Sequence, residues 1–243
     1  QMEDPRLAKG VVKREVIRVV TPGTLVETSM LDEGQNNFIA SICPEGEQYG
    51  LAVADISTGE IHAAQFTDPD DSTLKNELSR FAPNEIVFHP AFLDKKEMAE
   101  FIRNRLSCCA ECLREEQYDF SEAQRRVLEQ FGKSDLSELS LDQRPLAVQA
   151  IGGLLDYLTE TQMNGVDRLV SLDLYSESQF MALDLTARRN LELTETMRTG
   201  EKKGTLLWVL DRTRTAMGKR LIRQYVEQPL LSPAVIGRRL DAV

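Results

Sequence analysis

The chain has 243 residues and a formal net charge of −10, and 42% of its residues are hydrophobic. This length allows one large domain or two ordinary ones, and the apolar content is sufficient for a buried core. No apolar run approaches the roughly 18 residues of a membrane span, and the first residues lack the apolar stretch of a signal peptide. These features argue against a membrane protein and a secreted protein, so we expect the cytoplasm. Because the chain begins with Gln1, we also expect an internal piece of a longer protein.

Charge is distributed unevenly along the chain. Residues 1–183 contain 17 Lys and Arg against 32 Asp and Glu, a net of −15, whereas residues 184–243 contain 12 against 7, a net of +5. Nonspecific binding to nucleic acid is carried by cations that displace counterions. The front part therefore disfavours phosphate contact, whereas the back part tolerates a polyanion or an acidic neighbour.

The first half of the chain has the pattern of an α/β fold. Residues 4–24 form a lead-in, with an extended β-branched run at 16–20 and a turn at 21–24. Three strands are predicted between residues 37 and 66, followed by a helix, a strand at 85–89, a second helix and a strand at 107–113. The order βββαβαβ predicts a mixed sheet with helices packed on its faces.

Two helices and a linker are predicted after this sheet. Residues 121–131 have apolar side chains at helical spacing, and Pro145 begins a long apolar helix that Asn164-Gly165 ends. The pair Gly152-Gly153 predicts a close approach of this helix to the sheet. Residues 168–176 are predicted to be a crossing linker into the basic part of the chain.

Four cysteines occur, and Cys109 and Cys112 form a C-x-x-C pattern. A zinc or redox site would need further partners, and the chain has only two histidines. The strand predicted here places the two thiols on opposite faces of the sheet. The sequence therefore predicts buried structural thiols in a reducing compartment.

The basic part of the chain contains three short helical patterns. Asp184 and Thr205 are predicted to cap the first two, the first of which carries apolar positions up to residue 194, and Pro229 ends the third. Trp208 lies in an apolar run and is predicted to be in the core. The third helix carries one apolar stripe, with Ile222 and Val226 beside it, formed by Met217, Leu221 and Tyr225.

The exact amino-acid sequence of this segment indicates more than its hydrophobic periodicity does. It reads LDLTARRNLEL at 183–193, KKGTLLWVLDRT at 202–213 and MGKRLIR at 217–223. These motifs closely resemble the start of the core, or lever, domain of the MutS mismatch-repair family. The lead-in, DPRLAKGVVKREVIRVVTPGT at 4–24, is similar to the tail of the family's mismatch-binding domain. The strand order βββαβαβ resembles the family's ribonuclease-H-like connector.

The resemblance implies a division of the chain into four parts. Residues 1–24 would be the tail of the mismatch-binding domain, 25–165 the connector, 166–177 a linker and 178–243 the beginning of the helical core. Family members recognise mispaired or unpaired bases and signal to MutL in an ATP-dependent way. We expect this chain to be the relay between these activities, without catalytic residues of its own.

The resemblance also implies partners and cofactors. MutL is expected to contact the connector, and mismatched double-stranded DNA is expected to bind other domains of a dimeric full-length protein. ATP and Mg²⁺ belong to an ATPase domain, and we expect no cofactor or metal in this chain. Seven motif residues are candidates for relaying between domains: Arg188, Arg189, Asn190, Arg212, Thr213, Gly218 and Arg220.

Two alternatives of other classes remain open from the residues themselves. Asp55 ends an apolar strand, where a ribonuclease-H-type nuclease holds Mg²⁺, and Glu77 could supply a second carboxylate. The fourth strand ends in Val-Phe-His-Pro without a carboxylate, and an aspartate before Ser-Thr-Gly also has a structural role in a turn. The second alternative is a nucleic-acid-binding helical module that uses the basic segment 188–223. Residues 200–205, GEKKGT, depart from the phosphate-loop pattern and predict a loop between helices.

Overall fold

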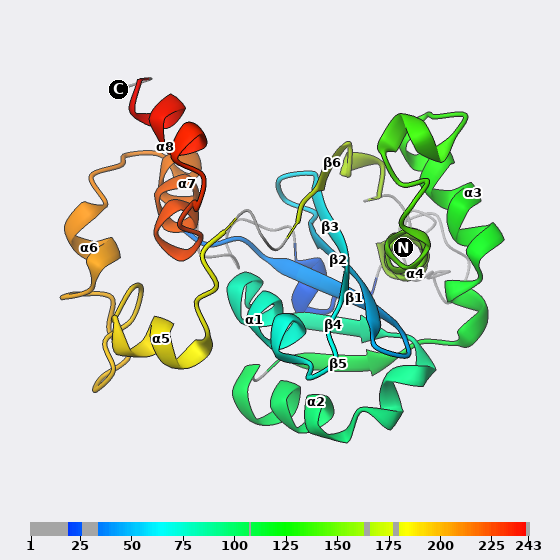
Figure 1. The fold of residues 1–243 in the computed structure, drawn as a ribbon, viewed down its shortest axis with the longest axis horizontal. Helices are drawn as coiled ribbons and strands as arrows, with labels where there is room; N and C mark the ends of the chain where they lie inside the picture. Colours follow the sequence, from blue (N-terminus) through cyan, green and yellow to red (C-terminus); the bar gives the residue numbers. More distant parts are fainter. Residues whose placement is uncertain (1–18, 26–33, 107, 163–165, 177–179, 242–243) are drawn as a thin grey trace, which may run out of the picture.

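A six-stranded mixed sheet forms the centre of the larger lobe of the molecule (Figure 1). The computed structural model describes residues 19–25, 34–106, 108–162, 166–176 and 180–241. The strand order is β5-β4-β1-β2-β3-β6, in which the β1–β2 and β2–β3 pairs are antiparallel and the other pairs are parallel. The strands are β1 (Phe38–Glu45), β2 (Gln48–Asp55), β3 (Glu60–Thr67), β4 (Glu85–Phe88), β5 (Cys109–Cys112) and β6 (Ser171–Leu174).

The central strand β2 is almost wholly apolar because both of its faces are covered. Leu51 and Val53 face one core, whereas Ala52 and Ala54 alternate with them and face the other. Short turns connect β1, β2 and β3, and Gly46 supplies the positive φ of 61° that the first turn requires. The mixed α/β sheet with flanking helices is therefore confirmed.

Helices cover the two faces of the sheet in separate layers. On one face lie α1 (Ser72–Phe81) and α2 (Lys96–Phe101), whose apolar side chains share a core with Leu51. On the other lies α4 (Pro145–Gln162), with α3 (Phe120–Phe131) packed against it (Figure 1). Of the described helices, none is both long and apolar enough to cross a membrane.

Gly152 and Gly153 of α4 do allow a close approach, but the prediction that they approach the sheet is wrong. A Cβ atom at Gly152 would overlap Ala123 of α3, and one at Gly153 would overlap the ring of Tyr118. These glycines therefore allow α3 and the turn before it to approach, and the sheet is instead approached at Gly50 of β2. A Cβ atom there would overlap the backbone carbonyl of Leu146. The predicted helix end at residues 164–165 lies outside the described residues.

The lead-in is anchored to the sheet and to the end of α4. The predicted turn at 21–24 is a short 3-10 helix, Pro22–Thr24. Its Gly23 N–H donates to the buried carboxylate of Glu85 at 2.8 Å, and the Val19 N–H donates to the Thr161 carbonyl at 2.8 Å. Of the extended run predicted at 16–20, residues 16–18 lie outside the described residues.

Residues 166–177, predicted as a linker, contribute a sixth strand. β6 pairs in parallel with β3 and places Asp173 opposite His62, with 3.0 Å between the Asp173 Oδ2 and His62 Nδ1 atoms. Its four residues are exposed or half-buried in alternation, as at an edge strand. So short a run carries no periodic signal in the sequence, and only pairing with β3 makes it a strand.

Four helices form the smaller lobe: α5 (Leu185–Asn190), α6 (Leu206–Leu210), α7 (Ala216–Glu227) and α8 (Pro233–Leu240). The predicted caps are confirmed, because Asp184 accepts from the Ala187 N–H at 2.6 Å and Thr205 accepts from the Trp208 N–H at 3.1 Å. The first helix is shorter than predicted. It ends at Asn190, and Glu192 adopts a positive φ of 46°.

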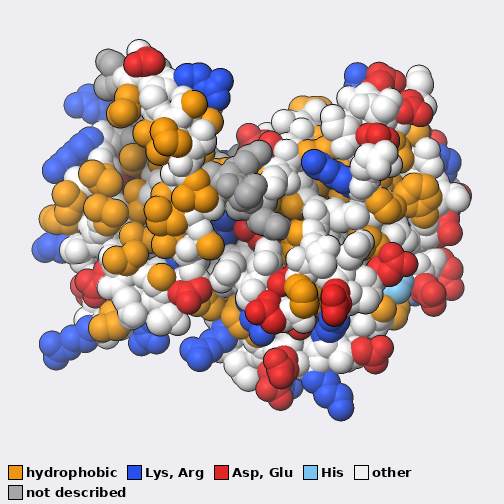
Figure 2. Space-filling view, viewed as in Figure 1, with side chains coloured by type: hydrophobic (Ala, Val, Ile, Leu, Met, Phe, Trp, Pro, Cys, Tyr) orange, Lys and Arg blue, Asp and Glu red, His pale blue; other side chains and the backbone are white. Residues whose placement is uncertain are grey.

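The smaller lobe buries only part of its apolar surface. Its core consists of Leu193, Leu207 and Val226. The core position predicted for Trp208 is wrong, since 48% of this residue is exposed. α7 packs through Ile222 and Val226, and the neighbouring stripe is exposed, with Met217 at 82%. Figure 2 shows hydrophobic side chains gathered over this lobe, because no described element covers them.

Candidate functional site

The backbone between the two lobes is joined to the end of α7. After β6 the chain passes through the buried residue Tyr175. Phe180 then forms an isolated antiparallel bridge with Leu230, and the Met181 N–H donates to the Pro229 carbonyl at 2.8 Å. The segment that enters the smaller lobe is therefore hydrogen-bonded to the residues that follow α7.

Arg80 of α1 lies at the centre of this junction. Its Nη2 atom is 2.8 Å from Glu77 Oε2, and both side chains are almost fully buried. The guanidinium lies over three rings, at 4.4 Å from Phe81, 4.4 Å from Tyr175 and 5.1 Å from Phe180. Arginine stacks on aromatic faces while it binds a carboxylate. Arg80 thus holds together α1, the segment after β6 and the segment that meets α7.

A second set of charged groups continues from this cluster into the smaller lobe. Arg188 of α5 donates from Nε to the Leu183 carbonyl and from Nη2 to the Glu227 carbonyl, both at 2.9 Å. The carboxylate of Glu227 accepts from Arg223 Nε at 3.1 Å. Burial lowers the pKa of Arg188 and raises the pKa values of Glu77 and Glu227, although neighbouring arginines partly oppose the shifts of both glutamates. These charged groups are therefore partly removed from water, and their ionised forms are stable there only because they are well paired.

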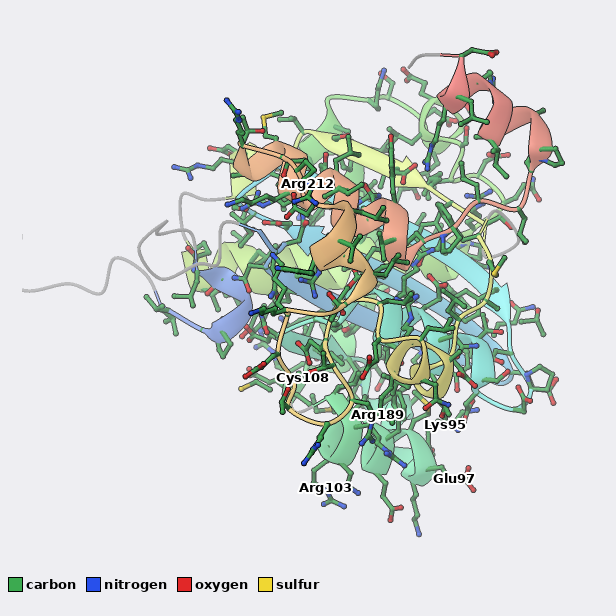
Figure 3. All side chains as sticks on the ribbon, turned by 90° about the vertical axis from the view of Figure 1, so that its left-hand side faces the viewer. Lys95, Glu97, Arg103, Cys108, Arg189 and Arg212 are labelled. Atoms are coloured by element: carbon green, nitrogen blue, oxygen red, sulfur yellow. The ribbon has the colours of Figure 1, made fainter. Side chains whose placement is uncertain are left out.

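The seven residues predicted from the motifs do not form one site. Arg188 lies in the junction, whereas Arg189, Asn190 and Arg212 are exposed, and Figure 3 shows Arg189 and Arg212 at the surface facing the viewer. Thr213 donates to Asp211 Oδ1 from its N–H at 3.0 Å and from its hydroxyl at 2.6 Å, which closes a local turn. Gly218 and Arg220 lie on α7, where they line a cleft of about 610 Å³ between the lobes.

Sequence reasoning missed most of the junction. The sheet lobe contributes Glu77, Arg80 and Tyr175 to the junction. In the sequence, nothing distinguishes this glutamate and this arginine from the many charged residues of an exposed surface. The one local signal is the spacing of Glu77 and Arg80, which places both side chains on the same face of α1. That spacing is equally common on exposed helices, so only the structure identifies the pair as buried.

The junction should make stability depend on pH through Glu227. Because burial raises the pKa of Glu227 above its unfolded value, the folded state binds the proton more tightly than the unfolded state. This contribution to stability is present below the unfolded pKa and is lost as the pH rises through the folded pKa. We therefore expect Glu227→Gln to become progressively more favourable relative to the wild type as the pH rises from the acidic range. Urea unfolding of both proteins at a series of pH values measures this difference, and a difference that is constant with pH would contradict it.

Asp55 is fully engaged in a structural turn. Its Oδ1 accepts from the Ser57 N–H at 2.8 Å and from the Ser57 hydroxyl at 2.6 Å. Its Oδ2 accepts from Asn36 Nδ2 at 2.9 Å and from the Asn37 N–H at 3.2 Å. Glu77, the second carboxylate considered, is bound to Arg80. Within the described residues no group of three His, Cys, Asp or Glu side chains could hold a metal ion. The geometry favours the structural role of Asp55 over the nuclease.

We expect Asp55→Asn to lower the free energy of unfolding by about 1–3 kcal/mol, because a neutral amide leaves buried donors without acceptors. Asp70→Asn is the matched control, since Asp70 makes a similar turn to Ser72 in an exposed position. Urea unfolding measures the effect. Hydrolysis of an RNA–DNA hybrid with Mn²⁺ that disappears in Asp55→Asn would instead support the nuclease.

The cysteines differ from one another in environment. Cys43 is buried, and burial raises the pKa of its thiol to about 12. The prediction of buried thiols is therefore confirmed for Cys43, but it is wrong for Cys109 and Cys112, which are exposed and free. The strand predicted around them is confirmed as β5, which is at the edge of the sheet and has all four residues exposed.

The loop that includes residues 200–205 lies between α5 and α6, as predicted. Gly200 and Gly204 adopt positive φ values of 66° and 97° there. No strand of the described residues precedes this loop in the position that a phosphate loop requires. The two glycines therefore allow the chain to change direction between the two helices.

Comparison with known proteins gives a consistent result along the chain. The family model described as MutS domain I matches residues 1–29, MutS domain II matches residues 37–173, and MutS domain III matches residues 186–243. The second of these covers the sheet as far as Asp173 of β6, and the third covers nearly all of the helical lobe.

Curated relatives are similar over the whole chain. The DNA mismatch repair protein MutS of Lachnoclostridium phytofermentans is 40% identical, with 100% of this chain and 26% of the relative covered. The proteins of the same name from Ruminiclostridium cellulolyticum and Acaryochloris marina are 41% and 43% identical, with 100% of this chain and 28% of each relative covered. The chain thus spans about a quarter of the length of these relatives. The match of MutS domain II over most of the chain shows that the chain belongs to the MutS family of DNA mismatch repair proteins.

Proposed function

We propose that this chain is the relay part of a mismatch repair protein, which couples recognition of mispaired or unpaired bases to ATP-dependent signalling to MutL. The order in which the family models match the chain supports this role, because residues 37–173 lie between the parts that match MutS domains I and III. The chain would contribute no catalytic residue. ATP and Mg²⁺ would act in an ATPase domain of the longer protein, in the cytoplasm.

The buried junction is the observation that carries the proposal. A relay requires an element whose equilibrium is biased by both of the sites that it connects. Arg80 is paired with Glu77 of its own helix and lies over the rings of Tyr175 and Phe180 at 4.4 and 5.1 Å. Phe180 in turn pairs with Leu230, just beyond α7. A displacement of either lobe would separate the buried guanidinium of Arg80 from the ring of Phe180, and a buried cation is favourable only while its surroundings stay well matched. Such contacts suit a switch between discrete arrangements.

The partners follow from the same proposal. The sheet lobe would contact MutL, and the acidic charge of residues 1–183 would direct that contact toward a basic surface. Mismatched DNA would bind to domains of the longer, dimeric protein. The part beginning at residue 178 would pass the signal into the core domain. β6 belongs to the sheet, so we place the boundary of the connector after it.

The relay is tested in the longer protein with two adjacent arginines of α5. We expect Arg188→Ala to reduce the coupling between ATP and MutL binding on mismatched DNA by about 0.5–2 kcal/mol. Arg189→Ala is the matched control, because Arg189 has the same charge and helix but is exposed. The measurement is the ratio of MutL affinities with and without ATP, which gives the coupling free energy directly.

The relay role would be contradicted if both variants kept the coupling of the wild type. If both variants weakened DNA binding equally, with a shallower dependence on salt, the nucleic-acid-binding alternative for segment 188–223 would be supported instead. Arg189 is exposed whereas Arg188 is half-buried and bonded in the junction, so loss of coupling in Arg188→Ala alone is distinguishable from equal loss of DNA binding in both variants.

A further inference from the structure

The cleft of about 610 Å³ between the lobes has two apolar walls. One wall is aromatic, where the rings of Phe38 and Phe81 meet edge to face with centroids 5.3 Å apart and His62 lies 5.5 Å from Phe81. The opposite wall is formed by α7, where Met217 and Leu221 are 82% and 47% exposed. The volume is in the range of small-molecule sites, and two such walls suit a flat apolar group.

One arginine of the cleft is without an ion-pair partner among the described residues. Of the three lining arginines, Arg80 is paired with Glu77 and Arg223 with Glu227. Arg220 has no ion-pair partner among the described residues, and its Nε atom is buried without an acceptor. A buried guanidinium donor without an acceptor is unfavourable. A carboxylate in the cleft could accept from the two terminal Nη groups of this guanidinium in matching planar geometry.

The other charges of the cleft limit the ligand to a single negative charge. The Glu60 carboxylate lies on the wall formed by the sheet, 3.8 Å from His62 Nε2, and 48% of its side chain is exposed. Glu227 lines the other end of the cleft. These two carboxylates would repel a ligand with several negative charges, such as a polyphosphate.

From these observations we infer that the cleft binds a small aromatic monocarboxylate. The carboxylate would be held by Arg220, and the ring would lie between the wall of Phe38 and Phe81 and the wall of Met217 and Leu221. Binding does not require the relay role, because the described lining residues that would contact the ligand, Phe38, Phe81, Met217, Arg220 and Leu221, all belong to this chain. A ligand in this position contacts both lobes and would hold them in one arrangement.

The test uses naphthoate as the probe and its neutral primary amide, naphthamide, as the matched compound. The chain is labelled at its methionine methyl groups, and each compound is titrated by NMR. We expect naphthoate to shift the Met217 signal in a saturable way while the Met197 signal, from outside this cleft, stays unchanged. Naphthamide should bind about ten- to hundredfold more weakly, as expected when a hydrogen bond to a charged group is lost.

Three variants make the result specific to the site. Arg220→Gln should weaken naphthoate about tenfold and leave naphthamide unchanged, and Met217→Glu, at an exposed position, should repel naphthoate without affecting the fold. Arg214→Gln, an exposed arginine of the same lobe, should change neither. The inference is overturned by equal affinity for acid and amide, by unchanged binding in Arg220→Gln, by shifts at Met197 in place of Met217, or by no saturable binding at millimolar probe.

Discussion

Replacing Arg80 by methionine is expected to lower the free energy of unfolding by about 3–5 kcal/mol. The guanidinium is buried between Glu77 and the rings of Phe81 and Tyr175, so its removal leaves an uncompensated carboxylate in an apolar environment. Burial already raises the pKa of Glu77, and loss of Arg80 removes the opposing effect. The destabilisation should therefore be smaller at acidic pH, where Glu77 is protonated in both states, and should grow as the pH rises.

Urea unfolding followed by circular dichroism measures this effect. Arg125→Met is the matched control, because Arg125 pairs with Glu122 and Glu129 on the surface of α3 with half of its side chain exposed. Exposed pairs contribute little to stability because water screens the charges. The double variant Glu77→Gln with Arg80→Met should recover most of the loss, since it leaves no unpaired charge. Equal effects of Arg80→Met and Arg125→Met would show that the pair is not buried in solution.

The second large effect is expected for Gly50→Ala in β2. A methyl group at this position overlaps the backbone carbonyl of Leu146, and a backbone cannot rotate away as the end of a side chain can. α4 would have to move off the sheet, which disrupts the bonds from the Leu146 and Ala147 N–H groups to Gln65 Oε1, at 2.9 and 3.4 Å. Overpacking of this kind costs about 1–3 kcal/mol and occasionally more.

Thermal unfolding checks this expectation, since about 1 kcal/mol shifts the Tm of a chain of this size by roughly 2–4 °C. Gly237→Ala is the matched control, because a Cβ atom there meets nothing within 4 Å. Gly237 lies inside α8, where alanine is the better helix former by about 1 kcal/mol, so this variant should be neutral or stabilising. If Gly50→Ala keeps the wild-type Tm, α4 does not lie as close to β2 as the structure places it.

The strands and caps that the sequence predicts correctly all depend on local signals. β2 is a continuous apolar run between turn residues, and Asp184 and Thr205 stand directly before their helices with free N–H groups to accept. The sequence motifs at 183–223 were likewise sufficient to indicate the family, which the domain matches then confirmed. These features are encoded within a few neighbouring residues.

The candidate site shows the limit of such reasoning. Arg188 and Arg189 are adjacent and chemically identical in the sequence, yet one is bonded in the junction and the other is exposed. The role of Arg80 depends on Tyr175 and Phe180, which lie about a hundred residues further along the chain. No pattern within one helix can indicate such partners.

By itself, then, the sequence determined the order of β1 to β5 and of the helices up to α7, the caps of α5 and α6, and the family. Only the tertiary structure decided that residues 171–174 are a strand, that Cys109 and Trp208 are exposed, and which face of α7 is buried. Hydrophobic periodicity reports which side chains can be buried, whereas the elements that cover them come from distant parts of the chain. Edge strands, exposed apolar stripes and buried ion pairs are consequences of that long-range packing.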